Sequence, residues 1–168
     1  RMKLTVAASA LALVTLCSEA SAQSKSLKDR LLGTWHFVIA EVTAPDGQKS
    51  FPFGPKPRGI LIFTPEGDFA QIHIAGEVPK IASGNRLAAT PEEYAGIMRG
   101  TIAQFGTYTV DEAKQTFTMK FTASTYPNWE GTLQTRSVDK LTDDEFINTN
   151  PQVGASRGSA YNLYRRAK

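Results

Sequence analysis

The sequence predicts an all-β fold, a single eight-stranded antiparallel barrel with an interior cavity. Short apolar runs are separated by turns drawn from 13 glycines and nine prolines, a pattern typical of β domains with many turns. Eight of these runs have strand character, the number at which an up-and-down barrel closes around side chains or one small ligand. The 168 residues, 41% of them hydrophobic, suit one domain with a substantial core.

The first predicted strand, residues 34–43, begins on the sequence Gly33-Thr34-Trp35. Glycine lets the backbone bend sharply at this point. The preceding residues 26–32 predict a short helix with its three leucines on one face. We expect this helix to pack on the floor of the barrel and the indole to plug the same end. Alternation along the strand places Trp35, Phe37 and Ile39 on one face.

The clearest hairpin joins residues 60–64 to residues 69–74 through the turn Pro65-Glu66-Gly67-Asp68. Alternation along its second strand places Gln71 and His73 on one face. If the aliphatic residues between them face outward, both side chains point into the cavity. In the opposite register both face water, and alternation alone leaves the two registers open.

Between the third and fourth strands the sequence predicts an inserted helix. Thr90 suits the N-cap, Pro91 suits the first helical position, and Glu93 completes a capping box. Apolar residues then recur at helical spacing, at Tyr94, Ile97, Met98 and Ile102. Two placements fit this pattern: a lid over an open barrel end, or a helix packed against the outside of the barrel.

Five further strands complete the predicted barrel, at residues 105–111, 116–122, 132–138, 145–150 and 159–166. In the second of them Phe117, Met119 and Phe121 alternate with threonine and lysine, which predicts one buried face and one exposed face.

The proline-rich segment 51–59 is predicted to be a stiff loop, because three prolines within six residues exclude a central strand. Its phenylalanines, Phe51 and Phe53, fit three interpretations. They could form a flap at the barrel mouth, cover an edge of the core, or dock a protein partner.

The N-terminal segment is interpreted as a cleaved secretory signal. The basic Met2-Lys3 precedes an apolar run over residues 4–16, and Ala20-Ser21-Ala22 forms a small-X-small cleavage site. The apolar run is shorter than the ~20 residues that a membrane span requires. The sequence therefore predicts a signal peptide over 1–22, a barrel domain over 23–168, a secreted or periplasmic location, and no stable membrane insertion.

Charge and side-chain inventory exclude several classes of function. Removal of residues 1–22 takes away two basic residues and one acidic residue, so the formal net charge falls from +3 to +2. The basic residues do not interleave with aromatic ones, so no nucleic-acid partner is expected. The single cysteine, Cys17, lies in the predicted signal, and the two histidines, His36 and His73, lack metal-ligand spacing. We predict neither metal nor cofactor, and the oligomeric state stays open.

Polar residues within apolar strands are the best candidates for a ligand site. Arg136 shares a strand face with Gln134 and Val138, and a buried arginine needs a partner because an unpaired buried charge is costly. It could grip a ligand carboxylate or enolate, or pair with a glutamate that holds the fold. The predicted ligand-binding residues are Gln71, Tyr94, Tyr108, Tyr126, Asn128, Trp129 and Arg136.

One set of side chains is suited to catalysis. His73, Tyr108 and Arg136 could move a proton at an activated carbon, as an isomerase, cyclase or lyase without a cofactor would require. The alternative interpretation is that His73 is a structural residue with its hydrogen bonds satisfied.

Seven short motifs follow one another along the predicted mature chain. They are Leu32-Gly33-Thr34-Trp35, Pro52-Phe53-Gly54-Pro55, Arg58-Gly59-Ile60-Leu61-Ile62-Phe63-Thr64-Pro65-Glu66-Gly67, Ala82-Ser83-Gly84-Asn85-Arg86-Leu87, Thr90-Pro91-Glu92-Glu93-Tyr94, Phe105-Gly106-Thr107-Tyr108 and Pro127-Asn128-Trp129-Glu130-Gly131-Thr132. As a set, they resemble the bacterial and fungal lipocalin-like domain family.

This resemblance implies a small closed barrel whose base is closed by the first-strand Trp35 beneath a last-strand arginine, Arg165 or Arg166. It does not imply one activity, because a fold does not set a function. We expect a protein that binds a small, mostly apolar or aromatic ligand inside the barrel. The alternatives are an acid/base enzyme in the same cavity and an interaction module that uses the loop of Phe51 and Phe53.

Overall fold

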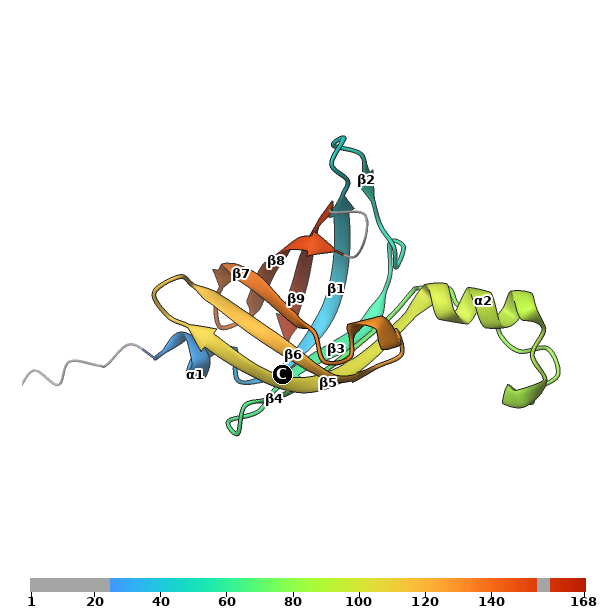
Figure 1. Cartoon of the computed structure of the whole chain (residues 1–168), viewed down its shortest axis with the longest axis horizontal. Helices are drawn as coiled ribbons and strands as arrows, with labels where there is room; N and C mark the ends of the chain where they lie inside the picture. The colour runs from blue at the N-terminus through green and yellow to red at the C-terminus, as the bar shows by residue number, and fades with distance from the viewer. Residues whose placement is uncertain (1–24, 154–157) are drawn as a thin grey trace, which may run out of the picture.

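The computed structural model describes residues 25–153 and 158–168 as a β-barrel with two short helices outside it (Figure 1). The predicted signal peptide, residues 1–22, lies outside the described residues. The strands are β1 (Gly33–Thr43), β2 (Lys49–Ser50), β3 (Arg58–Phe63), β4 (Asp68–Ile74), β5 (Thr101–Asp111), β6 (Thr116–Ser124), β7 (Leu133–Leu141), β8 (Glu145–Val153) and β9 (Gly158–Arg166). The helices are α1 (Leu27–Leu31) and α2 (Pro91–Gly100), and the 3₁₀ turns are η1 (Arg86–Ala88) and η2 (Pro127–Trp129).

Closure of the barrel depends on β1, which pairs with both ends of the sheet. Its first residues pair with β3, Gly33 lying opposite Phe63, while its length from Trp35 to Thr43 pairs with β9. The other strands follow in chain order, and every neighbouring pair is antiparallel. β2 only adds two residues beside the end of β1. The predicted eight-stranded antiparallel barrel is confirmed.

A register shift in β1 changes which residues face the interior. The pairing with β9 shifts between Phe37 and Ile39, as a β-bulge with one extra residue would produce. Trp35 and Phe37 are buried as predicted, but Ala40 continues the buried row in place of Ile39. The bulge therefore brings a small side chain, Ala40, to the interior in the half of the barrel away from α1.

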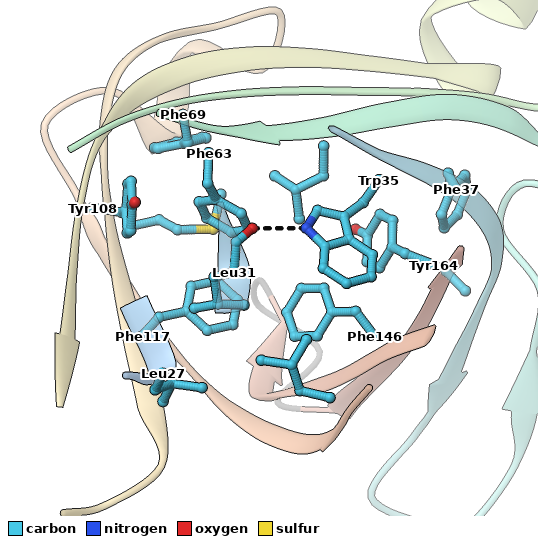
Figure 2. Close-up of a cluster of buried hydrophobic side chains, with 14 of the residues drawn as sticks. Leu27, Leu31, Trp35, Phe37, Phe63, Phe69, Tyr108, Phe117, Phe146 and Tyr164 are labelled. Carbon is cyan, nitrogen blue, oxygen red and sulfur yellow. Dashed lines mark hydrogen bonds between the residues drawn. The ribbon is translucent and has the colours of Figure 1, made fainter. Parts of the chain in front are cut away.

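The end of the barrel beside α1 is filled by apolar side chains (Figure 2). Leu27 and Leu31 of α1 are buried there, as predicted for a helix on the floor. Above them Phe63 meets Tyr108, Phe117 and Phe146 edge-to-face, while Phe146 stacks on Tyr164. Buried members of this cluster include Trp35, Phe63, Phe69, Tyr108, Phe117, Met119, Phe121 and Phe146. Each of these side chains is at most 5% exposed.

Trp35 and Arg166 close the base of the barrel. Gly33 adopts φ +104°, a conformation that glycine tolerates, and this bend carries the chain from α1 into β1. The indole Nε1 of Trp35 donates a hydrogen bond of 2.8 Å to the Leu31 carbonyl (Figure 2). The Arg166 guanidinium lies 4.0 Å from the centroid of the indole, a cation–π distance. Of the two candidates, Arg166 therefore makes this contact, while Arg165 pairs with Glu145.

The capping box of α2 is confirmed. The Thr90 hydroxyl accepts from the Glu93 backbone N–H at 3.2 Å, and the Glu93 carboxylate accepts from the Thr90 N–H at 2.8 Å. The helix is shorter than the apolar spacing predicts, because it ends at Gly100 and Ile102 already lies in β5. Pairing of Thr101 with Ile74 of β4 begins the strand there, so sheet hydrogen bonds outweigh the helical pattern.

α2 matches neither predicted placement. It extends away from the barrel (Figure 1), and its Tyr94 and Met98 are 45% and 47% exposed. Its last turn meets the barrel, where Met98 and Arg99 line the cavity, so α2 borders the mouth without covering it and does not lie along the outer wall. Among the described helices, none is long and apolar enough to cross a membrane.

Replacement of Arg166 by lysine should destabilise the fold. Arg166 donates to the carbonyls of Leu32, Arg30 and Asp143 at 2.7–2.8 Å, and one lysine ammonium cannot reproduce that fork. We expect Arg166→Lys to lower the free energy of unfolding by about 2 kcal/mol, measured by urea denaturation. The matched control Arg165→Lys removes no such contacts and should cost under ~1 kcal/mol. Equal losses in the two variants would contradict this role of Arg166.

Candidate functional site

A cavity of about 350 Å³ lies at the end of the barrel away from α1. Its rim consists of exposed or half-buried apolar side chains, among them Val42, Phe53, Met98, Ile102, Tyr126 and Trp129. Its interior wall consists of buried polar side chains, namely Gln71, His73, Gln104, Arg136, Asn150 and Asn162. The volume is within the range of small-molecule sites.

The register of the β3–β4 hairpin places Gln71 and His73 inside. Both line the cavity and are at most 4% exposed, whereas Ile72 between them faces outward and is 37% exposed. The sequence left this choice open, because either face of β4 carries apolar side chains. Closure of the barrel decides it, since only one face of each strand can be enclosed.

A continuous chain of hydrogen bonds runs through the wall of the cavity. The Ser124 hydroxyl donates to the Gln104 carbonyl at 3.3 Å, and the Gln104 amide donates to the Gln71 carbonyl at 2.6 Å. The Gln71 amide then donates to the Tyr164 hydroxyl at 3.0 Å and approaches His73 Nε2 at 3.1 Å. Tyr164 Oη lies 2.9 Å from the same His73 nitrogen. Because each group in this series donates to the next, His73 Nε2 is the last acceptor of the hydrogen-bond chain.

His73 is held neutral by its surroundings. Burial lowers the pKa of His73 well below its ordinary value, and the charge of Arg136 lowers it further. The imidazole stacks on Phe37 with the ring centroids 3.7 Å apart. The ring of Phe53 meets it edge-to-face, with the ring centroids 5.3 Å apart. Burial raises the pKa of Tyr164 to about 12, although Arg136 and Gln71 act in the opposite direction. Both groups therefore stay uncharged near neutral pH.

Arg136 is buried beside the cavity, and no carboxylate of the described residues pairs with it. It is 5% exposed, and its Nη2 donates to the Gln134 side-chain oxygen at 3.1 Å. That oxygen also accepts from the Asn150 amide at 3.1 Å. Nε and Nη1 of Arg136 have no hydrogen-bond partner within the described ranges. The glutamate partner considered in the sequence analysis is therefore replaced by the neutral Gln134.

Five of the predicted site residues are gathered around the cavity: Gln71, His73, Tyr126, Trp129 and Arg136. Trp129 stacks against Phe121 with the ring centroids 5.8 Å apart, and Tyr126 meets it edge-on at 5.4 Å. Together these aromatic rings form one side of the rim.

Three predicted site residues lie elsewhere. Tyr108 belongs to the apolar base, where its hydroxyl donates to the Thr64 carbonyl at 2.9 Å. Tyr94 donates to the Arg86 carbonyl outside the barrel, and Asn128 is exposed on η2. The predicted catalytic set of His73, Tyr108 and Arg136 is therefore not assembled. Tyr108 points inward, but at the level of the base.

Sequence reasoning missed Tyr164, the tyrosine that does contact His73, together with Gln104 and Asn162. Alternation along β9 places Tyr164 and Asn162 on one face, and closure of the barrel turns that face inward. This alternation was present in the sequence. The closed sheet, however, is needed to show that β9 lies across the barrel from β4. In the part of the chain that the structure describes, no three His, Cys, Asp or Glu side chains gather as a metal site.

Comparisons with known proteins identify the barrel. A family model described as a lipocalin-like domain matches residues 32–162. Similar solved structures include a lipocalin-like protein from Bacteroides uniformis, with 14% identity and a TM-score of 0.45 over 82% of this chain and 99% of that chain. A bovine odorant binding protein, solved in complex with a selenium-containing odorant, has 14% identity and a TM-score of 0.42 over 86% and 74% of the two chains. No curated protein sequence matches.

Acid should destabilise the fold through His73. Because its pKa is lowered in the folded state, the unfolded chain binds one more proton below the ordinary histidine value of ~6.5. Stability should therefore fall as the pH drops from 7 to 5, by up to about 1.4 kcal/mol per pH unit. Urea denaturation across this range should show a shallower slope for His73→Gln. The exposed His36→Gln is the control, and an unchanged slope in His73→Gln would refute the assignment.

Proposed function

Because the chain belongs to the lipocalin-like domain family, we propose that it is an exported barrel that binds a small, mostly apolar or aromatic molecule in its cavity. The observation that carries this proposal is the contrast between the two halves of the interior. The base is packed with buried aromatic side chains, whereas the other half contains a cavity of about 350 Å³. Export rests on the signal-like sequence of residues 1–22.

Small side chains leave the space for a ligand. Ala40, which the β1 bulge turns inward, and Ala160 of β9 both line the cavity and are at most 8% exposed. The aromatic rim supplies flat apolar surface against which a ring or a chain can lie. Burial of that surface by a ligand supports affinity at about 25 cal/mol per Å².

The hydrogen bonds of His73 favour binding over acid/base catalysis. A general base needs a free lone pair facing the substrate, yet His73 Nε2 already meets both Gln71 and Tyr164. Burial also raises the pKa of Tyr164, so its hydroxyl is a poor source of protons. The catalytic alternative therefore has less support than ligand binding.

The contacts of Phe51 and Phe53 favour a role for their loop at the barrel mouth over a role in docking a protein partner. Phe53 turns inward, lines the cavity and meets Phe37 edge-on with the ring centroids 5.6 Å apart. Phe51 is 50% exposed, so one exposed ring is left for a partner. The flap interpretation and the core-cover interpretation both describe Phe53, since it lines the mouth and packs against the core.

The mature domain should bind the neutral fluorescent probe N-phenylnaphthylamine with a stoichiometry of one. Ala160→Leu should weaken this binding about tenfold or more, because the added side chain occupies the cavity. The matched control Ala70→Leu places the same atoms on the outer face of β4 and should bind as the parent does. Fluorescence titration measures the dissociation constants, and urea denaturation confirms that each variant is folded.

Native mass spectrometry of the domain purified from its own host provides the complementary test. A stoichiometric small molecule released by denaturation would support the proposal. An empty protein that also ignores the probe and a panel of aromatic compounds would refute it.

A further inference from the structure

We propose that the ligand carries a carboxylate, which binds the guanidinium of Arg136 inside the barrel. This inference rests on the proposed function and narrows it, from an apolar molecule to an amphipathic organic anion. The apolar body would lie against the aromatic rim, and the acid group would point into the barrel.

The first support is the incomplete hydrogen bonding of Arg136. A guanidinium has five N–H groups. In this one Nη2 donates to the Gln134 oxygen at 3.1 Å, and the Tyr164 hydroxyl also interacts with the guanidinium. Nε and Nη1 are buried and have no partner in residues 25–153 and 158–168. A buried donor left without a partner costs about 1–3 kcal/mol, and more when it is charged. A ligand that supplies oxygen atoms would satisfy these groups.

The second support is the uncompensated charge of Arg136. Among the described residues, the cavity lining contains no Asp or Glu, and its other arginine, Arg99, is exposed to solvent. The remaining buried polar groups of the lining are amides and His73. The ion pairs of the described chain lie at the surface and join Glu41, Asp111 and Glu145 to lysines or to Arg165. An isolated buried charge is costly, so the interior favours a molecule that brings the opposite charge.

The third support is an excess of donors in the same half of the interior. Asn148 of β8 is fully buried, and its Nδ2 has no partner among the described residues. Its side-chain oxygen already accepts from Asn162 at 3.4 Å. The Gln134 oxygen likewise accepts twice, from Arg136 and from Asn150. The side-chain oxygens of Asn148 and Gln134 therefore already accept hydrogen bonds while donors beside them remain without a partner, and a carboxylate contributes acceptors only.

The charge balance favours a carboxylate over a phosphate monoester. Arg136 contributes the one buried positive charge of the described lining, since Arg99, the other arginine there, is exposed to solvent. His73 is held neutral by burial. A carboxylate would neutralise the buried charge of Arg136, whereas a phosphate monoester with a charge near −2 would leave a buried negative charge beside it. A carboxylate also matches guanidinium geometry for two parallel hydrogen bonds.

A matched pair of probes tests the inference. A naphthoate and the naphthamide of the same substitution share shape and apolar area, but only the naphthoate is charged at pH 7.5. We expect the mature domain to bind the naphthoate about ten- to a hundredfold more tightly than the naphthamide. Titration calorimetry gives both dissociation constants.

Three substitutions test whether Arg136 is the source of this preference. Arg136→Gln should bring the affinities for the two probes to within about threefold of each other. The control Lys120→Gln removes the same charge from the exposed face of β6 and should keep the preference. Arg136→Met should be at least as stable without ligand as the parent, since it removes an unpaired buried charge. A purely structural arginine would instead make Arg136→Met less stable.

The outcomes separate the inference from the proposed function. If the naphthamide binds as tightly as the naphthoate, the inference is wrong while the binding function stands. If the preference for the naphthoate persists in Arg136→Gln, the assignment to Arg136 is wrong. If neither probe nor N-phenylnaphthylamine binds, the proposed function fails together with the inference. If Arg136→Gln does not fold, Arg136→Lys replaces it. Together with the comparison of the two probes on the parent protein, that variant still tests whether a carboxylate binds at Arg136.

Discussion

The double pairing of β1, with β3 on one side and β9 on the other, closes the barrel, and everything else in the interior depends on it. The contact between Trp35 and Arg166 holds this closure at the base, because Arg166 links the last strand to the carbonyls before β1. Once the sheet is closed, each strand has one enclosed face. That constraint turns Gln71, His73 and Arg136 toward one another from strands distant in sequence.

The interior divides into an apolar half and a polar half with different roles. Burial of aromatic side chains near α1 supplies the stability of a chain whose described residues contain no cysteine. The polar half works against stability, because it encloses an arginine with unpaired N–H groups. Proteins tolerate such local costs most often where a ligand relieves them. The division therefore separates the part that holds the fold from the part that is suited to recognition.

His73 and Tyr164 illustrate how a buried network can limit chemistry. Their contact of 2.9 Å resembles an acid/base pair when viewed alone. The neighbouring Gln71 occupies the same histidine nitrogen, and burial opposes charge on both rings. The pair is better explained as a rigid part of the cavity wall, which holds the polar surface in one arrangement beside Arg136.

The sequence by itself determined the eight strands of the barrel, the capping box of α2, the buried face of β6 and the burial of Trp35. Each of these follows from local periodicity or local hydrogen bonding. Only the tertiary structure decided that Tyr164 meets His73 while Tyr108 lies in the base, and that Gln134 takes the place of a carboxylate beside Arg136. Alternation tells which way a side chain points, but not its height along the barrel axis. That height depends on the registers of all eight strands and on the bulge in β1.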